Sequence, residues 1–162
     1  MLPLLLLLVP LVLADQSCSN GTFYSYNGDK CFRVVNDLLS FYDAEYMCSI
    51  YGGHLASIHN KWDNDVLTGI VGSSFWLGGR DVNNDAKWTW TDGSSFEYSN
   101  WAASGPSHAS RRNCLLVDGN TFLWAASDYS IKANFVCETP LASTLPSTPT
   151  TVVPTSPSTT NG

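Results

Sequence analysis

The stretch from Trp101 to Ala126 holds the residue types best suited to binding chemistry. His108, Arg111 and Arg112 form a small cationic cluster, and Pro106 before them is the only proline between residues 12 and 139. An arginine guanidinium presents a planar fork of donors that matches carboxylate and sulfate groups. The cluster indicates contact with an acidic partner, such as a sulfated or sialylated glycan or a protein carboxylate. A solvated charged surface is the alternative.

The elements around this cluster are expected to position it. Cys114–Val117 predicts a buried strand, Asp118-Gly119 predicts a turn, and Phe122 and Trp124 alternate on a returning strand. A loop mounted on such a rigid hairpin is where binding residues collect, so we take it as the candidate ligand loop. Its candidate residues are Trp101, Gly105, Pro106, Ser107, His108, Arg111 and Arg112.

Other patterns that could carry chemistry are weaker. Asp81–Asp85 matches the start of a calcium loop, D-x-N-x-D, but Ala86 stands where a helix–loop–helix site needs glycine. We predict a polar hairpin loop there, with an auxiliary cation site as the alternative. The three histidines share no metal-ligand spacing, and the sequence has neither a Gly-x-Ser-x-Gly elbow nor a phosphate-binding glycine loop. We therefore expect no enzyme, no cofactor and no metal centre.

The two ends of the chain differ in composition from its middle. Met1–Ala14 is apolar, ends in a small residue and is shorter than the roughly 20 residues that span a bilayer, so it predicts a signal peptide. Residues 139–162 hold five prolines, many serines and threonines and no charge, which predicts a disordered, O-glycosylated tail without a membrane anchor. Between them, residues 15–138 predict one domain of a secreted, extracellular protein.

Charge and aromatic content narrow the class of partner. The net charge of −6 argues against nucleic acid and against an anionic membrane as partners. The six tryptophans, seven tyrosines and seven phenylalanines favour an aromatic core under irregular loops, with a sugar-stacking surface as the alternative. An extracellular protein or glycan is therefore the expected partner.

The N-terminal part predicts a disulfide-tied hairpin. Cys18 and Cys31 bracket the aromatic run Phe23–Tyr26 and a turn at Asn27-Gly28, and in a secreted chain two such cysteines pair. Asn20-Gly21-Thr22 is a glycosylation sequon, which makes Asn20 the candidate N-glycosylation site.

Two helices followed by short strands predict an α+β fold. Ser40 with Asp43 forms a short capping box for a helix that Gly52-Gly53 ends. The residues expected on its buried face are Phe41, Ala44, Met47, Cys48 and Tyr51. A second helix is expected from Asn60 to Gly72 with Trp62, Val66, Leu67 and Ile70 inward. Strands are expected at residues 54–58, 75–78, 88–90, 114–117 and 134–137.

Several motifs in one order point to a family. After the helix containing Cys48 come Gly52-Gly53-His54-Leu55-Ala56-Ser57-Ile58, Trp76-Leu77-Gly78, Trp88-Thr89-Trp90, Thr91-Asp92-Gly93, Asn100-Trp101, Cys114 and Phe135-Val136-Cys137-Glu138. From Cys18 to Glu138 this order resembles a C-type lectin-like domain, and the short form with a Ser/Thr/Pro tail is similar to secreted lectin-like proteins of nematodes. The resemblance implies the double-looped fold of that family, with Cys18 bound to Cys31 and Cys48 bound to Cys137.

The chain departs from the family at the sugar site. The family holds a calcium ion there through a Glu-Pro-Asn or Gln-Pro-Asp triplet, a glutamate before the third cysteine, and a Trp-Asn-Asp. The matching positions here are Gly105-Pro106-Ser107, Arg112 and Trp124-Ala125-Ala126. These residues remove the carboxylate and amide oxygens that calcium needs. We expect a binding module that recognises a protein or an acidic partner without calcium, with calcium-independent glycan recognition through residues 105–112 as the alternative.

The cysteine count leaves one cysteine over. The family pairs the cysteine at Cys114 with one at the position of Tyr129, and this chain has five cysteines in all. Cys114 is therefore expected to be a buried free thiol, while a disulfide to a second chain or another partner within the chain are the alternatives.

Overall fold

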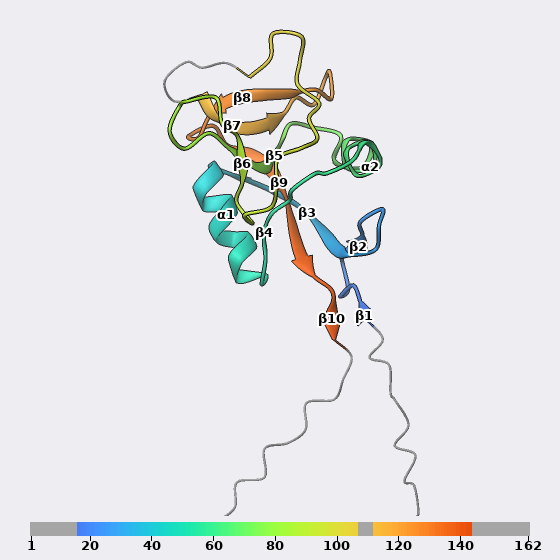
Figure 1. The fold of residues 1–162 in the computed structure, drawn as a ribbon. Helices are drawn as coiled ribbons and strands as arrows, with labels where there is room; N and C mark the ends of the chain where they lie inside the picture. The colour runs from blue at the N-terminus through green and yellow to red at the C-terminus, as the bar shows by residue number, and fades with distance from the viewer. Residues whose placement is uncertain (1–15, 107–111, 144–162) are drawn as a thin grey trace, which may run out of the picture.

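The computed structural model describes residues 16–106 and 112–143. Its elements are β1 (Gln16–Ser17), β2 (Phe23–Tyr24), β3 (Lys30–Leu39), α1 (Phe41–Ile50), β4 (His54–Leu55), α2 (Lys61–Val71), β5 (Phe75–Arg80), β6 (Thr89–Trp90), β7 (Arg112–Val117), β8 (Trp124–Asp128), β9 (Ala133–Pro140) and β10 (Ala142–Ser143). Two helices and a mixed sheet confirm the α+β class (Figure 1). Within the described residues no helix is both long and apolar enough to cross a bilayer.

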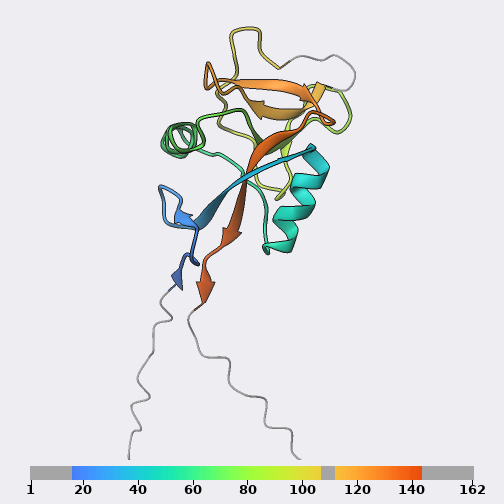
Figure 2. The ribbon, with the colours of Figure 1, turned by 180° about the vertical axis from the view of Figure 1, so that it is seen from behind.

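The main sheet has the strand order β2-β3-β9-β5-β7-β8, with β4 added to β9 and β6 to β5. The β5–β9 contact is parallel, and the other pairings are antiparallel. The β3–β9 ladder forms one end of the domain, and the β7–β8 hairpin lies at the other (Figure 1). The helices α1 and α2 lie on opposite sides of the sheet, as the view from behind also shows (Figure 2). The short β1–β10 ladder joins the two ends of the described chain.

The first helix forms as its local sequence predicts. The Ser40 side chain accepts a hydrogen bond from the Asp43 backbone N–H at 3.4 Å, and its hydroxyl donates to the Asp43 carboxylate at 2.6 Å. One otherwise unsatisfied backbone N–H at the helix start, that of Asp43, is thereby paired, and the second bond fixes the two side chains against each other. Of the residues expected inside, Phe41, Ala44 and Cys48 are buried. Met47 packs against them half-buried, whereas Tyr51 is the exposed C-cap under the Arg33 guanidinium.

The second helix has the predicted ends but presents the opposite face to the core. Asn60 caps it through the Asp63 backbone N–H at 2.8 Å, and Gly72 ends it in the left-handed conformation. The expectation that Trp62, Val66 and Ile70 point inward is wrong, because all three are exposed. Leu67 is the one expected residue that is buried, and the other buried residues of this helix are Asp63, Asn64 and Thr68.

Three details of the strand predictions also change. Of the strand expected at residues 54–58, only His54–Leu55 pair with β9. Residues 55–58 are all buried, because this segment lies between β9 and the turn at Thr91, whose hydroxyl donates to the Leu55 carbonyl. Phe122 lies in the turn with a positive φ of 58°, so the returning strand begins at Trp124. The tail expected from residue 139 begins inside the sheet, since β9 continues to Pro140 and β10 follows it.

The core divides into two clusters. One, around Trp90, Leu115, Trp124 and Val136, fills the space under β7 and β8. The other, around Phe41, Trp76, Phe135 and the Cys48–Cys137 disulfide, joins α1 to the sheet. A second disulfide joins Cys18 to Cys31, so the structure has the two pairs that the family resemblance implies.

Candidate ligand-binding loop

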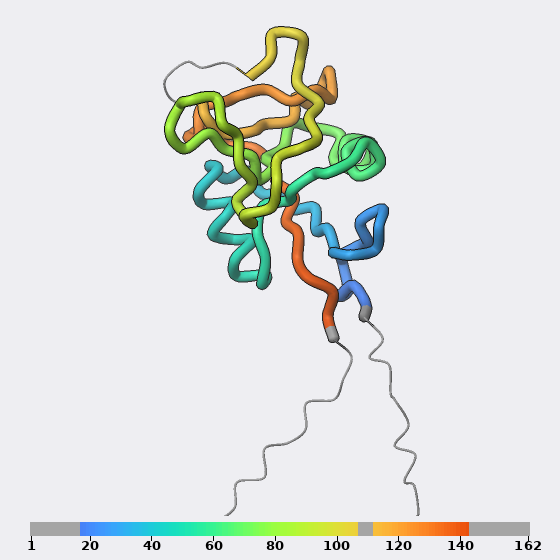
Figure 3. Tube along the Cα trace, viewed as in Figure 1, coloured from blue at the N-terminus to red at the C-terminus, as the bar shows by residue number. Residues whose placement is uncertain are grey.

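The loop base is attached to β8 by backbone hydrogen bonds. Residues 91–106 follow β6 and run toward the end of the domain that carries β7 and β8 (Figure 3). There Trp101 forms a parallel bridge with Trp124: the Trp124 N–H donates to the Asn100 carbonyl at 2.9 Å, and the Ala102 N–H donates to the Trp124 carbonyl at 3.0 Å. The Gly105 N–H then closes a turn onto the Ala102 carbonyl at 2.7 Å, with a φ of 65° that suits glycine.

Aromatic packing holds the same segment against the core. The Trp101 ring lies 4.6 Å from that of Trp88 and 5.7 Å edge-on from that of Trp124. Phe96 stacks on Trp90 at 4.7 Å, and Tyr98 meets Trp124 edge-on at 5.6 Å. Tilted and edge-on ring pairs of this kind add stabilisation beyond the area they bury. The loop base is therefore a preformed support rather than a loose connection.

Only part of the candidate loop lies within the described residues. Trp101 is half-buried and serves as an anchor, and Gly105 and Pro106 end the described segment. Ser107, His108 and Arg111 lie outside the described residues. Arg112 opens β7, is exposed, and stands opposite Asp128 in the β7–β8 register. The structure thus brings the loop base and Arg112 to one end of the domain (Figure 1).

The described residues that the family resemblance aligns with its calcium ligands carry no carboxylate or amide side chain. Trp124 is buried with its indole N–H donated to the Asn64 side chain at 2.8 Å, and Ala126 is nearly buried. The Ala125 and Ala126 methyl groups carry no oxygen, and Arg112 brings a positive charge. Calcium takes six to eight oxygen ligands, mostly from carboxylates, so this donor set offers it little. Across residues 16–106 and 112–143, no group of three or more His, Cys, Asp or Glu side chains could hold a metal.

The Asp81–Asp85 segment is the polar loop between β5 and β6 that the sequence predicts. The Asp81 carboxylate is buried and accepts the N–H groups of Asp85 at 3.1 Å and Ala86 at 3.0 Å. Because its oxygens point at the backbone of its own loop, this carboxylate stabilises the turn.

Cys114 is a free thiol buried in the sheet, with 0% of its surface exposed. Burial raises the pKa of its thiol to about 12, so the reactive thiolate is scarce at neutral pH. Tyr129, at the position of the family's partner cysteine, is exposed and packs against Tyr42. A second chain would reach the Cys114 sulfur only if β7 opened, which disfavours a disulfide-linked dimer through this residue.

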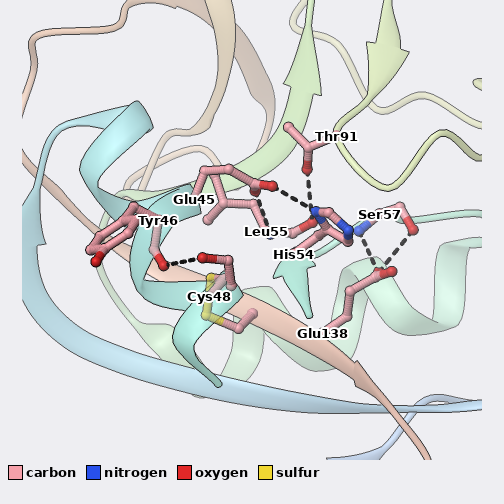
Figure 4. The surroundings of a disulfide bond; sticks show 10 residues. Glu45, Tyr46, Cys48, His54, Leu55, Ser57, Thr91 and Glu138 are labelled. Atoms are coloured by element: carbon pink, nitrogen blue, oxygen red, sulfur yellow. Dashed lines mark hydrogen bonds and ion pairs between the residues drawn. A yellow bond between two sulfur atoms is a disulfide. The ribbon is translucent and has the colours of Figure 1, made fainter. Parts of the chain in front are cut away.

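A buried polar cluster was missed by the sequence predictions. The Lys30 ammonium donates to the Ser57 carbonyl and hydroxyl at 2.8 Å each and to the Glu138 carboxylate at 2.7 Å. Glu138 also accepts the Ser57 N–H at 2.7 Å (Figure 4), and the Ser57 hydroxyl lies 2.7 Å from Asp92. Near it, the Glu45 carboxylate is paired with the His54 ring at 2.6 Å and accepts the Leu55 N–H at 2.8 Å, close to the disulfide of Cys48 (Figure 4).

The environment of this cluster shifts two carboxyl groups in opposite directions. Burial raises the pKa of Glu138, although the Lys30 charge acts against it. Partial burial alone would also raise the pKa of Asp92, but hydrogen bonds with Ser94, Glu138 and Ser57 hold it at about 2. Ser57 is fully buried, and its hydroxyl is hydrogen-bonded within the cluster. A cavity of about 570 Å³ borders Lys30, Gly53 and Glu138, at the end of the domain away from the candidate loop.

Comparison with known proteins agrees with this architecture. The model of the lectin C-type domain matches residues 37–139. The galactose-specific lectin nattectin of Thalassophryne nattereri is 29% identical over 76% of this chain and 81% of its own length. A lectin of Pleurodeles waltl is 33% identical over 76% of each chain. The crystal structure of a calcium-independent type II antifreeze protein superposes with a TM-score of 0.74 at 25% identity, over 79% of this chain and 98% of that one.

Proposed function

Because the chain belongs to the C-type lectin domain family, we propose that it is a secreted binding module that recognises an extracellular protein or acidic partner without calcium. The contact surface is the loop face from Gly105 to Arg112, which includes residues outside the described ranges. What supports the proposal is an anchored loop base together with the side chains of Arg112, Ala125 and Ala126, which carry no oxygen.

The charge at the loop favours an acidic partner over a metal. Arg112 is exposed at the start of β7, and the sequence places Arg111 and His108 beside it. A guanidinium repels a divalent cation and binds carboxylate or sulfate through paired hydrogen bonds. The similar calcium-independent antifreeze protein supports the idea that this fold can work without the ion.

Secretion belongs to the same proposal. The signal peptide at Met1–Ala14, the glycosylated tail and the likeness to nematode lectin-like proteins are expectations from the sequence. The two disulfides are consistent with an oxidising compartment, and Asn20 of the sequon is exposed where a glycan could be attached.

Calcium-independent glycan binding is the second candidate. It is favoured by the similarity to a lectin whose name specifies galactose and by the exposed arginine, which suits sialylated or sulfated sugars. Both candidates use the same loop face, so one variant set addresses both.

The test is binding of the mature protein to a glycan array and to a panel of displayed extracellular proteins, each in chelator and in calcium. Arg112→Ala is compared with Lys132→Ala, which removes an exposed cation from the β8–β9 turn. We expect chelator-resistant binding that Arg112→Ala weakens and Lys132→Ala leaves intact. Signal on acidic glycans selects the second candidate and signal on proteins the first, whereas binding that appears only in calcium contradicts both.

A further inference from the structure

The outward face of α2 carries large apolar side chains. Trp62, Val66 and Ile70 are 57%, 46% and 54% exposed, and their spacing of four residues aligns them along one side of the helix. We call these three residues and Gly69 the α2 stripe. The helix lies at the edge of the domain in both views (Figures 1 and 2), and the exposed fractions of its side chains leave the α2 stripe open to a partner.

The inward face explains why the apolar residues point outward. The Asn64 side chain accepts the buried Trp124 indole N–H at 2.8 Å, and the Asp63 carboxylate accepts the Tyr26 N–H at 2.7 Å. Both residues are buried by these contacts. The fold of the domain therefore uses the face of α2 that carries Asp63, Asn64 and Leu67, and nothing within the described residues covers most of the opposite, apolar face.

Trp62 is held in place before any partner arrives. The Tyr26 ring stacks on it at 5.5 Å with an interplanar angle of 20°, and Tyr26 is itself 63% exposed. A side chain ordered in advance loses less conformational entropy on association, which favours binding.

Gly69 leaves a bare spot on the same face. A Cβ atom at this position would meet nothing within 4 Å, so no contact inside the described chain requires a glycine there. A glycine inside a helix is less favourable than an alanine there. A large side chain of another molecule can therefore approach the helix backbone closely at Gly69.

Trp62 and the pair Gly69–Ile70 lie at nearly equal distances along the helix on either side of Val66. If two copies of α2 meet antiparallel across a two-fold axis near Val66, Trp62 of one copy lies over Gly69–Ile70 of the other, and the reverse holds. Such self-complementarity is what an isologous contact requires. Lys61 and Asp65 pair with each other on the flank, so the stripe has no net charge despite the −6 of the whole chain. We propose that the α2 stripe is the contact surface of a symmetric dimer of this chain.

The exposed area predicts a weak dimer. An aromatic side chain buries about 150–250 Å² when covered, so the half-exposed stripe and Tyr26 give roughly 800–900 Å² over two copies. Stable interfaces bury about 1,200–2,000 Å², so the dimer should form only at high local concentration. The described ends of the candidate loop lie away from α2 (Figure 1), so a dimer through α2 leaves these ends uncovered, and two linked sites bind a repeated ligand with avidity.

Sedimentation velocity of the full mature chain tests the dimer between about 5 and 500 µM, the range expected for a small interface. The wild type should shift from monomer toward dimer, and Trp62→Ala and Gly69→Gln should each weaken association at least about tenfold. Gly69→Gln is informative because glutamine favours helix, so the variant should melt no earlier than the wild type. Tyr46→Ala, at a 65% exposed position on α1, is the control and should leave association unchanged.

Cross-linking tests the two-fold axis directly. Under mild oxidation Val66→Cys should form a covalent dimer faster than Tyr46→Cys, because only the first thiol meets its own copy at the axis. A wild type that stays monomeric throughout the range overturns the proposal. So does a dimer that survives Gly69→Gln, or equal cross-linking of the two cysteine variants.

Discussion

The two ends of the domain are held together by different chemistry. The end built on β3, β9 and α1 has both disulfides and the Lys30–Glu138 cluster, so covalent bonds and a buried ion pair fix it. The end built on β7, β8 and residues 91–106 has neither, and its one cysteine, Cys114, is free. Ring packing around Trp124 holds that end. This fold can therefore hold the candidate loop by backbone hydrogen bonds and aromatic packing, without a covalent link at that end.

Removing the long-range disulfide should have the largest effect. Replacing Cys48 and Cys137 by alanine opens a link between residues 89 apart, and we expect unfolding to become easier by about 4–5 kcal/mol. Replacing Cys18 and Cys31, which are 13 apart, should cost about 3 kcal/mol. Urea denaturation measures both, and an equal or reversed order would contradict the account.

Breaking the ion pair should come next. Lys30→Met leaves the Glu138 carboxylate buried without its counter-charge, which should cost about 3 kcal/mol at neutral pH. Lys132→Met, at an exposed lysine, is the control and should have little effect.

The cost of Lys30→Met should depend on pH. Since the folded-state pKa of Glu138 is raised above its ordinary 4.5, the folded protein binds this proton more tightly and loses stability as pH rises through the folded pKa. Without Lys30 the pKa rises further, so the deficit should be small near pH 4 and grow toward pH 7. Thermal melts of both proteins across this range measure it, and a deficit independent of pH would show that the charge is not the cause.

A smaller effect, an increase in stability, is expected from adding a disulfide at the end of the domain built on β7 and β8. In Tyr129→Cys the new thiol stands at the position that the family pairs with Cys114, so a bond should form and stabilise the protein by about 2 kcal/mol. Tyr129→Ser controls for loss of the ring. Thiol titration of the unfolded protein should find no free cysteine in Tyr129→Cys, and two free thiols would refute the pairing.

Local chemistry made much of the fold predictable. Ser40 and Asn60 cap helices through neighbours three residues away, and Gly72 ends α2 through its own backbone conformation, so each acts within a short window of sequence. The order of the motifs predicted both disulfides, because the resemblance to a family implies which distant cysteines pair, whereas composition does not.

Contacts between residues far apart in the sequence explain where the sequence predictions were wrong or incomplete. Asn64 turned inward to meet Trp124, 60 residues away, and this turned Trp62 outward against the periodicity. Lys30 and Glu138 are 108 residues apart, so no sequence window contains both. For the candidate loop, the sequence indicated the cationic residues, while the anchoring of Trp101 on Trp88 emerged only from the fold.

The central claim is that the loop face works without calcium, and a calorimetric titration of the mature protein with calcium tests it most directly. Melting temperatures in calcium and in chelator should accompany it. We predict no saturable heat and the same melting temperature in both conditions, because the side chains of Arg112, Ala125 and Ala126 offer no ligand oxygen. Saturable heat together with a higher melting temperature in calcium would contradict the account and make calcium-dependent sugar binding the leading hypothesis.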